Sequence, residues 1–166
     1  MKHKANGSLQ YYKVRLIAKG YTQTYGMDYL KTFPPVAKMN TVRILLSLAV
    51  NRGWSLQQFD LKNVFLHGDL NKEIYMEIPP WFELEKNKAC RLKKALYGLK
   101  RSPKAWFGRF ARVMKALGYK QSYGDHTLFL KHSALGGVTT LLVYMDDIVL
   151  IGDYLQGMEV LERCLL

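Results

Sequence analysis

Three aspartates, Asp60, Asp146 and Asp147, are the residues of this sequence whose placement best suits chemistry. Asp146 and Asp147 are adjacent and lie between two strongly apolar stretches, whereas Asp60 ends a short stretch with the pattern of a strand. Neighbouring carboxylates repel each other, and apolar surroundings deprive them of solvation. Divalent cations relieve both penalties, and magnesium prefers oxygen ligands. Two such ions about 3.5–4 Å apart could activate an attacking hydroxyl and stabilise a pyrophosphate leaving group.

The Asp146–Asp147 pair also fits an ordinary hairpin turn, because Asp is favoured in turns. The spacing alone leaves both interpretations open. A metal site built from nitrogen and sulfur is not indicated, since Cys90 and Cys164 lie far apart and none of the four histidines stands at zinc-site spacing from them.

The elements that must position these aspartates include several predicted strands. Alternating or apolar stretches predict strands over residues 11–18, 55–59, 73–78, 90–93, 128–131, 138–145 and 148–151. The segment 5–8 (Ala-Asn-Gly-Ser) favours a turn, so that 11–18 becomes the second arm of a hairpin. A tight turn is predicted at Asp146 and Asp147, and Asp60 then follows directly on a strand.

Three helices are predicted between these strands. The first has apolar residues at helical spacing (Val42, Leu45, Leu46, Ala49 and Val50), an N-cap at Asn40 or Thr41, and an end near Gly53. The second begins at Ser102 as N-cap, with Pro103 at its first position, and ends at Gly118. A third starts near Leu155. Because helices and strands do not alternate regularly, we expect one domain of the α+β class.

Four segments support a more specific hypothesis. They are 13–23 (KVRLIAKGYTQ), 59–68 (FDLKNVFLHG), 96–107 (LYGLKRSPKAWF) and 144–147 (YMDD). In this order and at this spacing they resemble the reverse transcriptase of copia-type retrotransposons, and the likeness covers nearly the whole chain. It implies the fingers-and-palm part of a right-hand polymerase, with an antiparallel palm sheet packed on helices. Residues 1–53 would be mainly fingers, and 54–166 would be mainly palm with a fingers insertion.

The resemblance implies RNA-directed DNA polymerase activity, in which a primer 3′-hydroxyl attacks a deoxynucleoside triphosphate with the help of two Mg²⁺ ions. Asp60 and Asp146 would be the main metal ligands, assisted by the backbone carbonyl of Leu61. Asp147 would support them near the primer end. The partners implied are an RNA or DNA template-primer and a dNTP.

The same resemblance implies a set of nucleotide-binding residues. Phe65, five positions after the first aspartate, would block the ribose 2′-hydroxyl, although a plain core Phe fits as well. Lys13 and Arg15 would hold the triphosphate, or else are solvated strand charges. Gly98 and Lys100 would shape the turn beside the template and the incoming nucleotide.

Some positions depart from the family pattern. Val64 stands where Ala is usual, Arg101 replaces a usual Gln, and Pro34 replaces a small residue. We also expect a truncated copy that lacks a thumb and the other polyprotein segments, because the family's fingers begin upstream of Lys2 and its palm continues past Leu166. The alternative is a non-catalytic remnant that is a basic nucleic-acid-binding domain.

The charge agrees with a polyanionic partner. The net charge is +12, and residues 1–59 carry nine Lys or Arg against one acid, which makes +8. Nucleic acid is the commonest partner of such a segment, although a merely basic soluble protein is compatible too. A hydrophobic fraction of 49% excludes a disordered chain. No apolar run approaches the ~20 residues of a membrane span, and no signal peptide is visible, so we expect an intracellular, cytoplasmic protein without a membrane partner.

Overall fold

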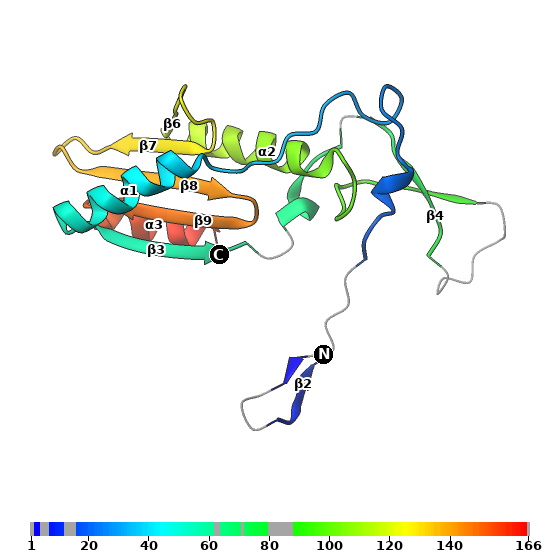
Figure 1. Cartoon of the computed structure of the whole chain (residues 1–166), viewed down its shortest axis with the longest axis horizontal. Coiled ribbons are helices and arrows are strands. Elements are labelled where there is room, and N and C mark those ends of the chain that lie inside the picture. The colour runs from blue at the N-terminus through cyan, green and yellow to red at the C-terminus, as the bar shows by residue number, and fades with distance from the viewer. Residues whose placement is uncertain are drawn as a thin grey trace.

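A five-stranded antiparallel sheet is the centre of the computed structural model, which describes residues 2–3, 7–11, 16–61, 64–70, 72–79 and 88–165. The strand order is β3-β9-β8-β7-β6, with β3 at one edge (Figure 1). The strands span Ser55–Asp60 (β3), Lys120–Gln121 (β6), Leu128–His132 (β7), Val138–Tyr144 (β8) and Asp147–Gly152 (β9). This arrangement, together with the helices below, confirms the α+β class.

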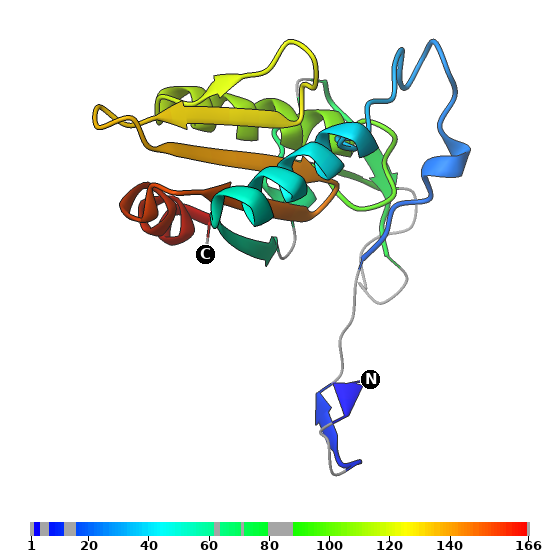
Figure 2. The ribbon, with the colours of Figure 1, turned by 60° about the vertical axis from the view of Figure 1, so that its left-hand side comes forward.

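Helices cover both faces of this sheet. The helix α1 (Met39–Arg52) lies across one face, while α2 (Ser102–Ala116) and α3 (Leu155–Leu165) lie on the other (Figures 1 and 2). The central strand β8 is therefore buried on both sides, which explains its nearly continuous apolar sequence. Within the described residues, no helix has both the length and the apolar character needed to cross a membrane.

Two hydrophobic clusters correspond to these two interfaces. In the first cluster, the helices α2 and α3 pack on one face of the sheet. The helices contribute Trp106, Phe107, Phe110, Met114, Met158 and Leu161, and the sheet contributes Phe129, Leu141, Val143, Ile148 and Leu150. Leu45 and Ala49 of α1 pack on Leu142 and Ile151. Alternate residues along a strand point to opposite faces, so β8 and β9 contribute to both clusters. Trp106 and Phe107, which end the segment 96–107, therefore belong to the core.

Two small antiparallel pairs lie outside the main sheet. The strand β1 (Lys2–His3) pairs with β2 (Leu9–Tyr11), and β4 (Tyr75–Glu77) pairs with β5 (Ala89–Arg91). Two 3-10 helices, η1 (Gly20–Thr22) and η2 (Val64–His67), complete the described elements. The hairpin at the N-terminus is thus present, but its second arm is β2, and the part of the expected strand at 12–15 lies outside the described residues.

The helix starts differ from their sequence predictions. Ser102 is not an N-cap but the first helical residue, and its hydroxyl accepts a hydrogen bond from the Leu96 N–H and donates one to the Leu96 carbonyl. Neither Asn40 nor Thr41 caps α1, which begins after Lys38. The predicted end of α1 is confirmed, because Gly53 has the left-handed φ of 64° that closes a helix.

The apolar stripe of α1 is only partly buried. Leu45 and Ala49 lie in the core, whereas Leu46 and Val50 are 43% and 83% exposed. The helix carries apolar residues nearly all round, so the spacing alone did not identify which of them face the sheet.

Candidate functional site

The three aspartates lie at one end of the strands of the main sheet, where β3 ends and β9 begins. Asp60 is the last residue of β3, Asp147 is the first residue of β9, and the two are register partners. Asp146 lies in the two-residue turn between β8 and β9, where its carbonyl oxygen accepts a hydrogen bond from the Leu61 N–H at 3.0 Å. In Figure 1 the end of β3 and the β8–β9 turn lie side by side at the sheet edge nearest β4. The fold therefore brings together carboxylates from distant parts of the chain.

Asp60 and Asp147 project from the same face of the sheet. Directly opposed residues of an antiparallel pair have Cβ atoms about 4.5–5.5 Å apart. Gln58, two residues before Asp60, donates from Nε2 to Asp147 Oδ1 at 3.3 Å, which places its side chain on this face as well. Asp60 is exposed, and Asp146 and Asp147 are half-buried. Both aspartates of the strand pair can thus be approached from solvent.

The β8–β9 turn has an unusual backbone. Met145 has a φ of 57°, and it is the only residue other than glycine with a positive φ among those described. A positive φ at the first turn position matches the right-handed twist of the strands. The Met145 N–H donates to the Pro35 carbonyl at 2.7 Å, so the segment before α1 holds the turn in place. The sequence predicts this turn at residues 146–147, but it lies one residue earlier and is formed by Met145 and Asp146.

The donor set at this edge consists of carboxylate oxygens, which suit Mg²⁺. Within the part of the chain that the structure describes, however, no three His, Cys, Asp or Glu side chains are grouped closely enough to hold an ion. The aspartates therefore offer the oxygen donors that Mg²⁺ prefers, and they lie at the same end of the sheet. The described side-chain positions, however, do not form a closed coordination sphere.

The predicted nucleotide-binding residues lie on two neighbouring segments. Phe65 is in η2, and Gly98 and Lys100 are in the loop that leads into α2. The Phe65 ring contacts the Tyr97 ring edge-on, with centroids 4.7 Å apart. Lys100 is exposed, and its N–H donates to Gln23 Oε1 at 2.8 Å. Lys13 and Arg15 lie outside the described residues.

The loop before α2 crosses the segment 16–20 with backbone against backbone. The Ala18 N–H donates to the Tyr97 carbonyl at 2.7 Å, and Ile17 and Tyr97 form a parallel bridge. Gly98 has a φ of 90°, and a Cβ there would lie 2.1 Å from the Ala18 oxygen. A Cβ on Gly20 would lie 1.8 Å from the Gly98 oxygen. The two backbones can lie this close only because both positions are glycine. Backbone geometry therefore accounts for Gly98 in the segment 96–107.

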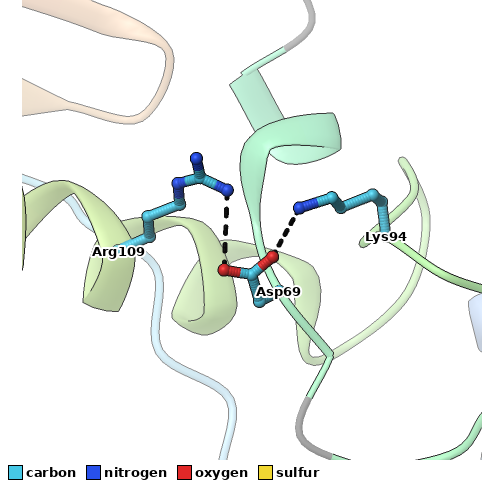
Figure 3. A network of polar contacts seen from close by, with 3 residues as sticks. All are labelled: Asp69, Lys94 and Arg109. Atoms are coloured by element: carbon cyan, nitrogen blue, oxygen red, sulfur yellow. Dashed lines mark hydrogen bonds and ion pairs between the residues drawn. The ribbon is translucent and has the colours of Figure 1, made fainter.

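An ion-pair network, which sequence reasoning missed, joins the segment after η2 to its neighbours. Asp69 pairs with Lys94, at 2.5 Å, and with Arg109 of α2, at 3.5 Å (Figure 3). The hydrogen bond from Lys94 lowers the pKa of Asp69 below its ordinary value. All three side chains are about half exposed, so the network orients the segment more than it stabilises the fold.

Asp125, also missed by sequence reasoning, is a buried carboxylate at the start of α1. It is 5% exposed and accepts hydrogen bonds from the Lys38 N–H at 2.9 Å and from the N–H and hydroxyl of Thr127. Burial opposes its ionisation, but the hydrogen bonds from Thr127, Thr41 and Lys38 outweigh burial, and the pKa of Asp125 is lowered. A carboxylate at a helix N-terminus is also favoured by the helix dipole. Asp125 takes the place of the N-cap that α1 lacks.

A cavity of about 860 Å³ lies apart from the aspartates, between the segment 16–28 and β4. Its charged lining residues are three cations (Lys19, Lys72 and Arg101) and three acids (Asp28, Glu73 and Glu77). Among the residues that the structure describes, the charges that line this cavity therefore sum to zero.

Comparison with known proteins agrees with the motifs. Residues 1–165 match the family model described as "Reverse transcriptase (RNA-dependent DNA polymerase)". The chain is 43% identical over 155 residues to the retrovirus-related Pol polyprotein from transposon RE1 of Arabidopsis thaliana, a match that covers 92% of this chain and 10% of that protein. It is 42% identical over 143 residues to the Pol polyprotein from transposon TNT 1-94 of Nicotiana tabacum, covering 85% of this chain and 11% of that protein.

A more distant relative is the Ty1-H Gag-Pol polyprotein of Saccharomyces cerevisiae, 30% identical over 152 residues, with 88% of this chain and 8% of that protein covered. The chain thus spans about a tenth of the length of the curated relatives it matches. No solved structure matches it significantly. The match over 165 residues, together with the ordered motifs, shows that the chain belongs to the reverse transcriptase family and is a copia-type reverse transcriptase domain of a retrotransposon polyprotein.

Proposed function

We propose that this chain is the catalytic part of a longer protein that carries out RNA-directed DNA synthesis, by transferring a nucleotide from a dNTP to the 3′-hydroxyl of a primer on a template. The register pairing of Asp60 with Asp147, next to Asp146 in the adjoining turn, is the observation that carries the proposal. In this proposal residues 54–166, which include all five strands of the main sheet, are mainly palm with a fingers insertion, and residues 1–53 are mainly fingers.

Asp60 and Asp146 would be the main ligands of two Mg²⁺ ions, with the Leu61 carbonyl assisting, and Asp147 would support them near the primer end. Two ions held there would supply activation of the primer hydroxyl and neutralisation of the charge that develops on the pyrophosphate leaving group. The exposed position of Asp60 leaves room for the substrate phosphates.

The remaining residues position the nucleotide. Phe65 blocks the space of a ribose 2′-hydroxyl, so that deoxynucleotides are preferred. Gly98 and Lys100 shape the loop beside the template and the base, and the backbone crossing with Ala18 keeps this loop rigid. Lys13 and Arg15 neutralise the triphosphate. Catalysis then comes mainly from positioning and electrostatic stabilisation.

Primer extension on an RNA template tests this proposal, with the protein expressed from its complete reading frame. We expect DNA synthesis that requires Mg²⁺, stops with a chelator and is absent in the Asp146→Asn variant. Template-primer binding without any extension by the parent would contradict the proposal and favour a non-catalytic nucleic-acid-binding domain.

A further inference from the structure

We propose that Tyr97 is a positioning residue for Phe65, and that its ring determines how strongly the enzyme rejects ribonucleotides. This inference rests on the proposed function, because it concerns the sugar selectivity of the same site. It adds a second specificity determinant that comes from the loop before α2.

The side chain of Phe65 lies between solvent and the core. Its exposure is intermediate, and two aromatic rings support it edge-on. The Tyr97 centroid lies 4.7 Å away with an interplanar angle of 77°, and the Trp106 centroid lies 6.5 Å away at 88°. Such edge-to-face pairs are favourable because the positive ring edge meets the negative ring face.

The two supporting rings differ in their burial. Trp106 is 3% exposed and packs on Phe107 and Phe110, so it is an integral part of the core. Tyr97 is only half-buried, and it comes from a loop. It is also the nearer of the two rings. Tyr97 is therefore the support whose replacement changes Phe65 with the least damage to the fold.

The backbone of Tyr97 is fixed from the other side. Its carbonyl accepts the Ala18 N–H, and the next residue, Gly98, leaves no space between the two segments. On the far side of the loop, the Ser102 hydroxyl binds both backbone groups of Leu96. A ring attached to so constrained a backbone is a firm support for Phe65.

Rigidity matters because the two sugars differ by one hydroxyl group. A ring that can retreat by about 1 Å accommodates the additional oxygen, and a displacement of that size is large on the scale of active-site positioning. Deoxynucleotides do not contact the ring through this position. Loosening Phe65 should therefore raise ribonucleotide use and leave deoxynucleotide use nearly unchanged.

Single-nucleotide incorporation kinetics with a dNTP and the matching rNTP test the inference, using the complete protein and the variants Tyr97→Leu and Tyr97→Phe. Tyr97→Leu should lower the dNTP:rNTP ratio of kcat/KM by roughly two- to tenfold, the factor that the loss of one ring pair corresponds to. The change should lie in the ribonucleotide value. Tyr97→Phe keeps the ring and should retain the parental ratio.

A double variant separates positioning from general damage. If Tyr97 acts through Phe65, then Tyr97→Leu should have no further effect on the ratio in a Phe65→Val background. Should Tyr97→Leu fail to fold by its thermal transition, Tyr97→Met carries the same expectation, since it is apolar and unbranched.

An unchanged ratio in an active Tyr97→Leu or Tyr97→Met protein would overturn the inference, as would equal effects of Leu and Phe. Independent effects of Tyr97 and Phe65 in the double variant would also overturn it. Absence of any incorporation by the parent is a different result, because it would refute the proposed function and the inference with it.

Discussion

Asp60 and Asp147 are register partners across the β3–β9 pair, so one carboxylate from each strand stands on the same face of the sheet edge. The main chain enforces this pairing, since the Leu61 N–H binds the Asp146 carbonyl directly beyond it. Neighbouring carboxylates that remain accessible to solvent are suited to bind cations. The strand pairing holds these two carboxylates side by side without any bound substrate.

Replacing either Asp60 or Asp146 by Asn should therefore abolish primer extension and leave the fold intact. Loss of a ligand from the proposed two-ion site would remove several kcal/mol of transition-state stabilisation, which lowers the rate by about 10³-fold. Single-turnover extension with Mg²⁺ measures the rate, and circular dichroism checks the fold. Glu159→Gln, which neutralises an exposed carboxylate on α3, is the matched control. Extension by Asp60→Asn near the parental rate would exclude a metal-binding role for this residue.

Phe65→Val should increase ribonucleotide incorporation relative to deoxynucleotides by at least about tenfold, because the discrimination is steric and one such contact corresponds to ~1–3 kcal/mol. Steady-state incorporation of both sugars opposite the same template base provides the ratio. Unchanged selectivity in a folded, active variant would mean that Phe65 is only a core residue.

Asp125→Ala should lower the free energy of unfolding by about 1–3 kcal/mol at pH 7, because the N–H and hydroxyl groups that donate hydrogen bonds to the carboxylate lose their acceptor. The pKa of Asp125 is lowered in the folded protein, so its contribution is complete above the ordinary Asp pKa and is lost as the pH falls through the folded pKa. The difference between parent and variant should thus decrease in the acid range, below about pH 4.

Urea titrations at pH 7 and pH 3 test this dependence, with Glu159→Gln again as control. A parent–variant difference that is the same at both pH values would show that the charge of Asp125 does not contribute.

Gly20→Ala and Gly108→Ala should change stability in opposite directions. A Cβ on Gly20 would overlap the Gly98 oxygen, and the crossing of the two backbones cannot give way without breaking the Ala18–Tyr97 hydrogen bond. Gly108 lies on the exposed side of α2 with nothing within 4 Å of its added Cβ, so Ala should stabilise the helix by about 0.5–1 kcal/mol. Thermal denaturation of both variants measures the signs, and a neutral Gly20→Ala would contradict the close approach.

Binding of a primer-template by the isolated chain should decrease steeply with salt. The first 59 residues carry +8, and each phosphate neutralised on duplex DNA adds about −0.9 to the log–log slope. Sequence preference should be small, because contacts to phosphates position a duplex without reading its base edges. Fluorescence anisotropy at several salt concentrations determines the slope, and Lys31→Gln with Arg43→Gln should make it shallower. Salt-independent binding would argue against a phosphate-dominated interface.

Local signals explain which parts of the fold can be predicted from sequence. Pro103 and Gly118 delimit α2 closely, and the apolar stretches around 146–147 predict the β8–β9 hairpin to within one residue. Gly53 likewise marks the end of α1. Each of these signals depends only on the backbone preferences of a few neighbouring residues.

The contacts between distant segments are not predictable in this way. Asp125 binds Lys38 across 87 positions, and Asp69 meets Lys94 and Arg109 through tertiary folding. The ring contact between Phe65 and Tyr97 joins two motifs whose relative orientation neither one specifies. At the candidate site, the motifs indicate which aspartates matter, but only the strand pairing shows that Asp60 faces Asp147.

The segment 35–38 is attached at both ends, through Pro35 to the Met145 turn and through Lys38 to Asp125. Loss of the buried carboxylate would therefore displace the support of the turn that carries Asp146. In a mutational scan scored by primer extension, substitutions at Asp125 would then lower activity, as would those at the proposed metal-binding aspartates. Genetic data alone would then identify Asp125 as a fourth essential acidic residue and suggest a catalytic role, although Asp125 anchors the start of α1.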